Sequence, residues 1–126
     1  MDSSRQPVSF IATDQPDETQ AFFSDVLGLE LVERSPFALV YSDAGHVLRI
    51  QIVPIFQPAS YTVHGWQVEN IVDGVAGLMA KDVRFQFFDH LPQDQHGIWT
   101  TPDGHKIAWF TDPCGNILSL TQYAES

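Results

Sequence analysis

One arginine lies among apolar residues, where an unpaired charge is energetically unfavourable. Arg49 lies in the middle of His46–Val53, a largely aliphatic segment, and is one of only six basic residues in the chain. An unpaired charge among apolar side chains is unfavourable, so Arg49 needs a partner. A guanidinium can clamp a carboxylate or other anionic group of a ligand. The alternative is an internal ion pair with an acidic residue on a neighbouring strand, and the sequence leaves both interpretations open.

Histidine clusters and nucleophile motifs give weaker signals. His90, His96 and His105 surround a polar loop of the second half, but no pair of them has the short spacing of a structural zinc site. We therefore expect solvent-facing loop histidines. The sequence contains no G-x-S-x-G elbow, glycine-rich phosphate loop or paired-carboxylate arrangement.

The clearest local structure is a hairpin within Gly104–Gln122, where two apolar runs flank Asp112–Asn116. Pro113 presets its own φ for an early turn position, and Asp112 can accept hydrogen bonds from the backbone. Gly115 tolerates a positive φ. The pattern predicts a type I turn followed by a left-handed glycine.

The rest of the chain repeats one order of elements. We expect a strand at 7–13, a helix at 16–27 and strands at 29–34, 37–42 and 46–53. After a linker at 54–60 we expect a strand at 61–68, a helix at 71–81, strands at 83–88 and 97–101, and the two hairpin strands. The repeat predicts an α+β fold of two paired modules, about 7–53 and 61–122, in a single domain.

Composition narrows the classes of partner. The 126-residue chain is 44% hydrophobic and has no apolar run near the ~20 residues of a membrane helix. Its formal charge of −10 argues against nucleic acid and anionic membranes as partners and permits a cationic ligand. The single cysteine and the absence of signal-peptide features in the first residues predict a cytoplasmic location.

Three stretches carry a resemblance to a known family. They are AFFSDVLGLELV at 21–32, WQVENIVDGVAGLMAKDV at 66–83 and IAWFTDPCGNILSLTQ at 107–122. The chain resembles the vicinal-oxygen-chelate superfamily, also called the glyoxalase/bleomycin resistance/dioxygenase family. The resemblance implies two βαβββ modules that form a curved mixed sheet with a concave ligand cavity. It also implies a homodimer and, in catalytic members, one divalent metal.

The resemblance assigns the metal-ligand positions to residues that ligate poorly. These positions fall on Val8, on Arg49 or Gln51, on Val63 and on Ser119. Valine has no donor atom, arginine stays protonated, and the Gln and Ser oxygens are weak ligands. A one-residue slip would bring His64 to the Val63 position, but it would turn every side chain of that strand to the opposite face. We expect His64 to lie under the helix instead.

Strand alternation predicts which residues line the pocket, because residues two apart share a face. The candidates combine apolar and aromatic side chains with a few polar groups, as binding sites commonly do. They are Phe10, Arg49, Gln51, Gln67, Trp99, Trp109, Ser119 and Thr121.

The function expected from these residues is metal-independent binding of a small organic molecule, with no cofactor, as in the resistance proteins of this fold. The alternative is a metal-dependent lyase, isomerase or dioxygenase of the glyoxalase type with an altered metal site. The sequence does not identify the ligand.

Overall fold

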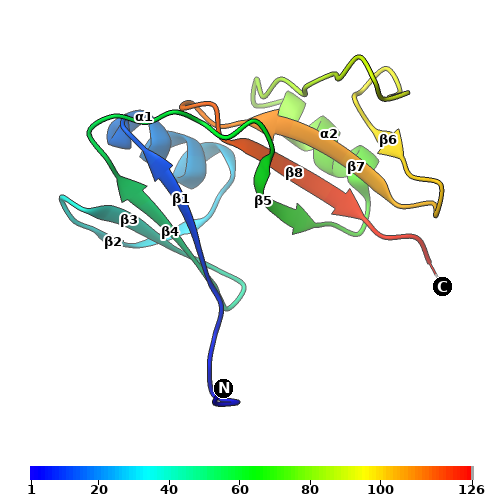
Figure 1. Ribbon diagram of the computed structural model, residues 1–126. Coiled ribbons are helices and arrows are strands. Elements are labelled where there is room, and N and C mark those ends of the chain that lie inside the picture. The colour runs from blue at the N-terminus through cyan, green and yellow to red at the C-terminus, as the bar shows by residue number, and fades with distance from the viewer. Residues whose placement is uncertain (126) are drawn as a thin grey trace. The chain divides into compact units, whose positions relative to one another are not determined.

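The computed structural model describes residues 1–125, and the chain divides into two compact units. The first unit is Met1–Gln57, and the second begins at Pro58 and includes the rest of the chain. Each unit contains a helical segment and its own four-stranded mixed sheet (Figure 1). The predicted α+β fold of two βαβββ modules is therefore confirmed. No helix among the described residues could cross a membrane.

The first unit places two distant strands side by side. Its elements are β1 (Val8–Thr13), α1 (Pro16–Ala21), η1 (Phe22–Val26), β2 (Glu30–Arg34), β3 (Ala38–Asp43) and β4 (His46–Ile52). The sheet order is β1-β4-β3-β2, with β1 parallel to β4 and the other pairs antiparallel. The parallel pair joins the start and the end of the module, so it places Phe10 directly opposite Arg49.

One face of this sheet forms the core of the first unit. Leu39, Tyr41, Leu48 and Ile50 are fully buried, and the Tyr41 ring lies 5.8 Å from that of Phe23 in η1. At the C-terminal end of β1, the hydroxyls of Thr13 and Thr19 are 2.7 Å apart, which satisfies two buried polar groups of β1 and α1. The helical segment therefore covers one face of the sheet and does not cover the opposite face.

The helix predicted at 16–27 changes type within its span. It is α-helical over Pro16–Ala21 and continues as a π-helix over Phe22–Val26. The wider turn ends at Gly28, whose φ is +74°, as predicted for a glycine that stops a helix. Apolar spacing alone does not distinguish the two helix types over so short a segment.

The second unit repeats the arrangement. Its elements are β5 (Thr62–Gln67), α2 (Ile71–Met79), β6 (Trp99–Thr100), β7 (Lys106–Thr111) and β8 (Ile117–Gln122). The sheet order is β5-β8-β7-β6, with β5 parallel to β8. Its core contains Leu118, Phe110 and Ala108 on one sheet face, together with Ile71 and Val75 of α2. Gly74 lets α2 approach closely, because a Cβ there would lie 3.2 Å from Leu120.

The hairpin between β7 and β8 is held by one buried carboxylate. Asp112 is only 4% exposed and accepts hydrogen bonds from Cys114 N, Asn116 N and Asn116 Nδ2 at 2.8–3.0 Å. Gly115 has a φ of +91° and donates its N–H to Asp112 O. The predicted turn with a left-handed glycine is present, and the Asp112 side chain supplies partners that the turn backbone would otherwise lack.

The strand predicted at 83–88 is absent. Only a single bridge links Phe85 to Phe110, and Gln86 N donates to Trp109 O at 2.7 Å. Beyond that point the loop backbone bonds to two side chains, Gln93 and Asp94, and to itself instead of to a strand. Gln93 accepts from Phe88 N and donates to Gln86 O and Gly97 O, at 2.6–2.8 Å. The apolar pattern of this segment reflects packing under a loop.

Candidate functional site

Five of the eight predicted binding residues lie on the face of the second sheet opposite α2. One cross-strand row runs Gln67–Thr121–Ile107–Trp99, and a second runs Gly65–Ser119–Trp109. Directly paired residues point to the same side of a sheet. We call this surface the tryptophan face; it comprises Thr62, Gly65, Gln67, Trp99, Ile107, Trp109, Ile117, Ser119 and Thr121.

Aromatic rings form a wall on the tryptophan face. The Trp99 and Trp109 rings are nearly parallel, with centroids 6.2 Å apart and an interplanar angle of 27°. Phe88 meets Trp109 edge-on, at 5.3 Å and 89°. The Trp109 Nε1–H donates to Thr62 Oγ1 at 3.0 Å, which fixes the orientation of the indole. Trp99 and Trp109 remain half-buried, so part of each ring is available to another planar group.

A hydroxyl lies beside this wall because Gly65 has no side chain. A Cβ on Gly65 would lie 2.2 Å from Ser119 Oγ and 2.9 Å from Ser119 O. Ser119 is 8% exposed, and its Oγ makes no hydrogen bond to any other residue among 1–125. Gly65 and Ser119 thus place an uncommitted hydroxyl between a bare stretch of backbone and the Trp109 ring.

The other three predicted residues lie on the first sheet, on the face opposite the helical segment. Phe10 and Arg49 are directly paired, and Gln51 follows two positions along β4. We call this surface the arginine face; it comprises Val8, Phe10, Ala12, Val47, Arg49 and Gln51. Phe10 is 57% exposed and Val8 46%, whereas Arg49 is half-buried.

The residues at the expected metal positions do not fit a divalent cation. Val8 and Val63 offer no donor atom, and Gln51 and Ser119 offer only neutral oxygens. Among residues 1–125, no three His, Cys, Asp or Glu side chains form a group that could hold a metal ion. The His64 ring lies 4.9 Å from Trp66, on the same face as the buried Leu118, as expected for a histidine under the helix.

The three histidines of the second half have separate surroundings. His90 and His96 are exposed, and the His90 ring lies 6.1 Å from Phe88. His105 is half-buried, and its Nδ1 accepts a hydrogen bond from Ala124 N at 2.9 Å. His105 therefore ties the segment after β8 to the loop before β7 and differs from the solvent-facing residue that was expected.

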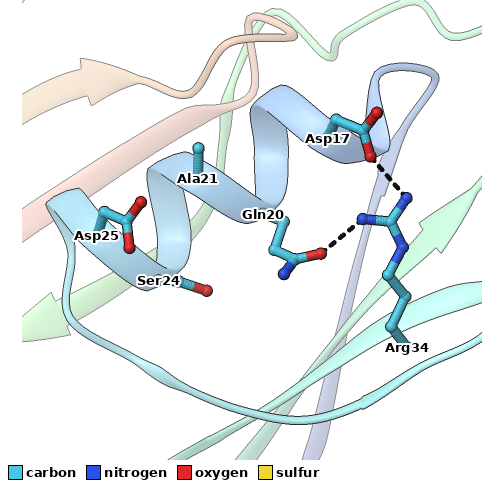
Figure 2. A pocket seen from close by; sticks show the side chains of 6 residues that line it. All are labelled: Asp17, Gln20, Ala21, Ser24, Asp25 and Arg34. Atoms are coloured by element: carbon cyan, nitrogen blue, oxygen red, sulfur yellow. Dashed lines mark hydrogen bonds and ion pairs between the residues drawn. The ribbon is translucent and has the colours of Figure 1, made fainter.

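Two hollows on the surface lie beside helices, and neither contains a predicted binding residue. The first, about 280 Å³ in volume, lies beside α1, where Arg34 bonds to Gln20 and forms an ion pair of 2.8 Å with Asp17 (Figure 2). The second, about 400 Å³, is an apolar groove along α2. The cation of the first hollow already has an acidic partner, and the second offers little besides apolar contact. The two sheet faces have the more specific chemistry.

Sequence reasoning missed two residues of this site: Phe88, whose ring lies against the tryptophan face, and Thr62, which belongs to that face. Phe88 was assigned to a strand, yet the loop that replaces this strand brings its ring against Trp109. Thr62 takes the place expected for Val63, because β5 contains a bulge between Thr62 and His64. Thr62 pairs with Ile117 and accepts the indole hydrogen bond. A bulge of one residue leaves no trace in an alternating pattern that is only six residues long.

Comparison with known proteins identifies the fold. No protein-family model matches the sequence, and no curated protein matches it. Solved structures do match over nearly the full chain. A bleomycin resistance determinant encoded on the transposon Tn5 is 20% identical, with a TM-score of 0.74 over 96% of this chain and 99% of that one.

Two further solved structures have the same fold. A glyoxalase/bleomycin resistance protein/dioxygenase from Alicyclobacillus acidocaldarius is 17% identical, with a TM-score of 0.73 over 96% of this chain and 92% of that one. TnmS3, an antibiotic-binding protein from Streptomyces sp. CB03234, is 18% identical, with a TM-score of 0.72 over 98% and 99%. The chain therefore has the glyoxalase/bleomycin resistance fold, and the resemblance expected from sequence is confirmed at the level of structure.

Proposed function

We propose that this protein binds a small organic molecule with a planar ring system, without a metal ion. The observation that carries the proposal is the aromatic wall of the tryptophan face, where Trp99 and Trp109 stack and Phe88 closes one edge. Such walls bind flat ligands because ring stacking adds to the burial of apolar surface. Neighbours of the same fold include an antibiotic-binding protein and a bleomycin resistance determinant, which supports a binding role.

The polar groups of the tryptophan face suit this role. Ser119, Thr121 and Gln67 lie on adjacent rows beside the rings, and none of them is charged. A few placed hydrogen-bonding groups in a largely apolar surface orient a ligand and select among similar shapes. The poor fit of the expected metal positions favours this role over the metal-dependent alternative. A lyase, isomerase or dioxygenase of the glyoxalase type would need ligands that these positions do not supply.

The test is a thermal-shift screen of planar aromatic compounds, followed by affinity measurements on variants. Compounds that bind the native state raise its melting temperature. Trp109→Ala is expected to weaken the hits about tenfold, because it removes the central stacking partner. The affinities can be measured by calorimetry on folded wild-type and variant proteins.

The matched control is Tyr61→Ala, which removes an aromatic ring that is 69% exposed and lies outside the tryptophan face. This variant should bind the same compounds as wild type. Equal affinity of wild type and Trp109→Ala for every hit would contradict the proposal. So would stoichiometric retention of nickel, zinc or iron by protein purified without chelator, if the metal were lost on mutation of Gln51 or His64.

A second part of the proposal is that the protein forms a homodimer. It is supported by the resemblance and by large apolar side chains on the surface of the first unit, such as Val32 at 54% exposed and Phe37 at 74%. Size-exclusion chromatography coupled to light scattering should give a molecular mass twice the 14.1 kDa of one chain. A single-chain mass at every concentration tested would refute the dimer and leave the binding proposal intact.

A further inference from the structure

We propose that the arginine face selects ligands that carry a carboxylate, with Arg49 as the group that binds it. The inference goes beyond the proposed function, because it assigns a second binding surface, on the first unit. The observation behind it is a half-buried guanidinium with no acidic partner. Arg49 forms no ion pair or side-chain hydrogen bond with any other residue among 1–125.

A second arginine of the same unit shows what a partnered guanidinium looks like here. Arg34, at the end of β2, bonds to Gln20 and forms an ion pair of 2.8 Å with Asp17 (Figure 2). Both side chains of this ion pair are exposed to solvent, as is usual for salt bridges on a protein surface. Arg49 sits in the centre of the sheet with no comparable contact. Its charge is therefore available to a group from outside the chain.

The strands on either side of β4 place apolar side chains next to Arg49. Its direct neighbours across the sheet are Phe10 on β1 and Val40 on β3, so its stem lies between two apolar side chains. Glu33 is the nearest acidic position in the same row, on the far side of β3, and the two do not pair. Apolar surroundings strengthen a charge-assisted hydrogen bond, because they lower the local dielectric. The position suits an anion that arrives attached to an apolar body.

The charge balance favours a carboxylate over a phosphate. A guanidinium fork matches either group. However, the arginine face holds one cation, and Glu30 and Glu33 stand on β2 of the same sheet, on a chain of net charge −10. A dianion would bring a second negative charge with no cation to meet it. A monoanionic carboxylate is neutralised by Arg49 alone, and the exposed Gln51 amide can donate a further hydrogen bond to it.

The experiment compares two probes of the same shape, 2-naphthoate and its neutral amide, 2-naphthamide. Both are titrated into the full chain, and binding is followed by NMR. The Phe10 ring signals report on contact with the naphthalene, because Phe10 is paired with Arg49 on the same face, and the Arg49 Nε–H signal reports on the carboxylate. Wild type is expected to bind 2-naphthoate about tenfold more tightly than 2-naphthamide, with the Arg49 signal shifting only for the acid.

Arg49→Gln should abolish this preference and bind the two probes equally. The matched control is Arg5→Gln, which makes the same change in net charge at an exposed residue of the same unit. It should keep the tenfold preference. Equal binding of both probes to wild type would overturn the inference and leave the proposed function standing. A preference that survives in Arg49→Gln would also overturn it. Binding of neither probe, with unmoved Phe10 and Arg49 signals, would contradict the inference as well.

Discussion

Asp112→Ala is expected to lower the free energy of unfolding by about 2–4 kcal/mol. The substitution removes a carboxylate that accepts three hydrogen bonds at 2.8–3.0 Å from Cys114 and Asn116. Asn116 is only 3% exposed, so its donors would lose their partner in a site that water reaches poorly. Urea unfolding followed by circular dichroism measures the loss.

The control for this prediction is Asp103→Ala, which removes an exposed carboxylate with the same change in net charge. It should alter the stability by less than about 0.5 kcal/mol. If the two variants were equally stable, Asp112 would not be what holds the hairpin. Far-UV spectra of both variants would show whether the fold itself survives.

The pH dependence of stability gives a second measurement on the same carboxyl. Burial raises the pKa of Asp112 above its ordinary 3.8, and hydrogen bonds from Asn116 and Cys114 oppose the shift. The native state then holds the proton more tightly than the unfolded state does. Wild type should therefore gain stability relative to Asp112→Asn as the pH falls from 7 towards 3.8, and the gain should level off below that value. A gain in the opposite direction would show that the hydrogen bonds outweigh burial.

Gly65→Ala is expected to cost about 1–3 kcal/mol, although alanine usually favours a strand over glycine. The new methyl group would meet Ser119 Oγ at 2.2 Å and the Ser119 carbonyl oxygen at 2.9 Å. The hydroxyl can rotate away, but the carbonyl belongs to the β8 ladder and cannot. Relief would require β5 to move away from β8, which weakens their pairing. Thermal unfolding of the purified variant measures the cost.

Gly77→Ala is the matched control, because a Cβ at Gly77 would meet nothing within 4 Å. In a helix interior this change should raise stability by about 0.5–1 kcal/mol. Adding Ser119→Ala to Gly65→Ala should recover part of the loss, because it removes the nearest atom. A Gly65→Ala protein as stable as Gly77→Ala would mean that β5 and β8 adjust freely.

The sequence predicted the fold where local chemistry and periodicity agreed. The DPCGN turn has its chemistry in five adjacent residues, and the parallel pairing of β1 with β4 follows from the repeat. Alternation also placed Gln67, Ser119 and Thr121 on one face of a sheet. These signals come from the local order of residues along the chain, so they can be recognised without knowing the tertiary contacts.

The errors share a physical cause. The apolar run at 83–88 has the composition of a strand, but Gln93 takes the backbone hydrogen bonds that a neighbouring strand would have taken. The bulge in β5, which exchanges Thr62 for Val63, likewise depends on a partner strand that is distant in sequence. Whether Arg49 has an acidic partner is also a question of contacts across strands. Single-sequence patterns contain no record of such contacts.

The hydrogen bonds of Gln93 affect how the ligand specificity of this fold could change through mutation. One amide side chain anchors the loop that carries Phe88, bonding to Gln86 O, Phe88 N and Gly97 O. A strand ladder would have tied each residue to a register, whereas this loop is held by the Gln93 and Asp94 side chains and by bonds within its own backbone. Substitutions between Phe88 and Gln93 can therefore accumulate without disturbing the sheet. Evolution, or a library built by an engineer, can exchange the ring beside Trp109 while the scaffold stays unchanged.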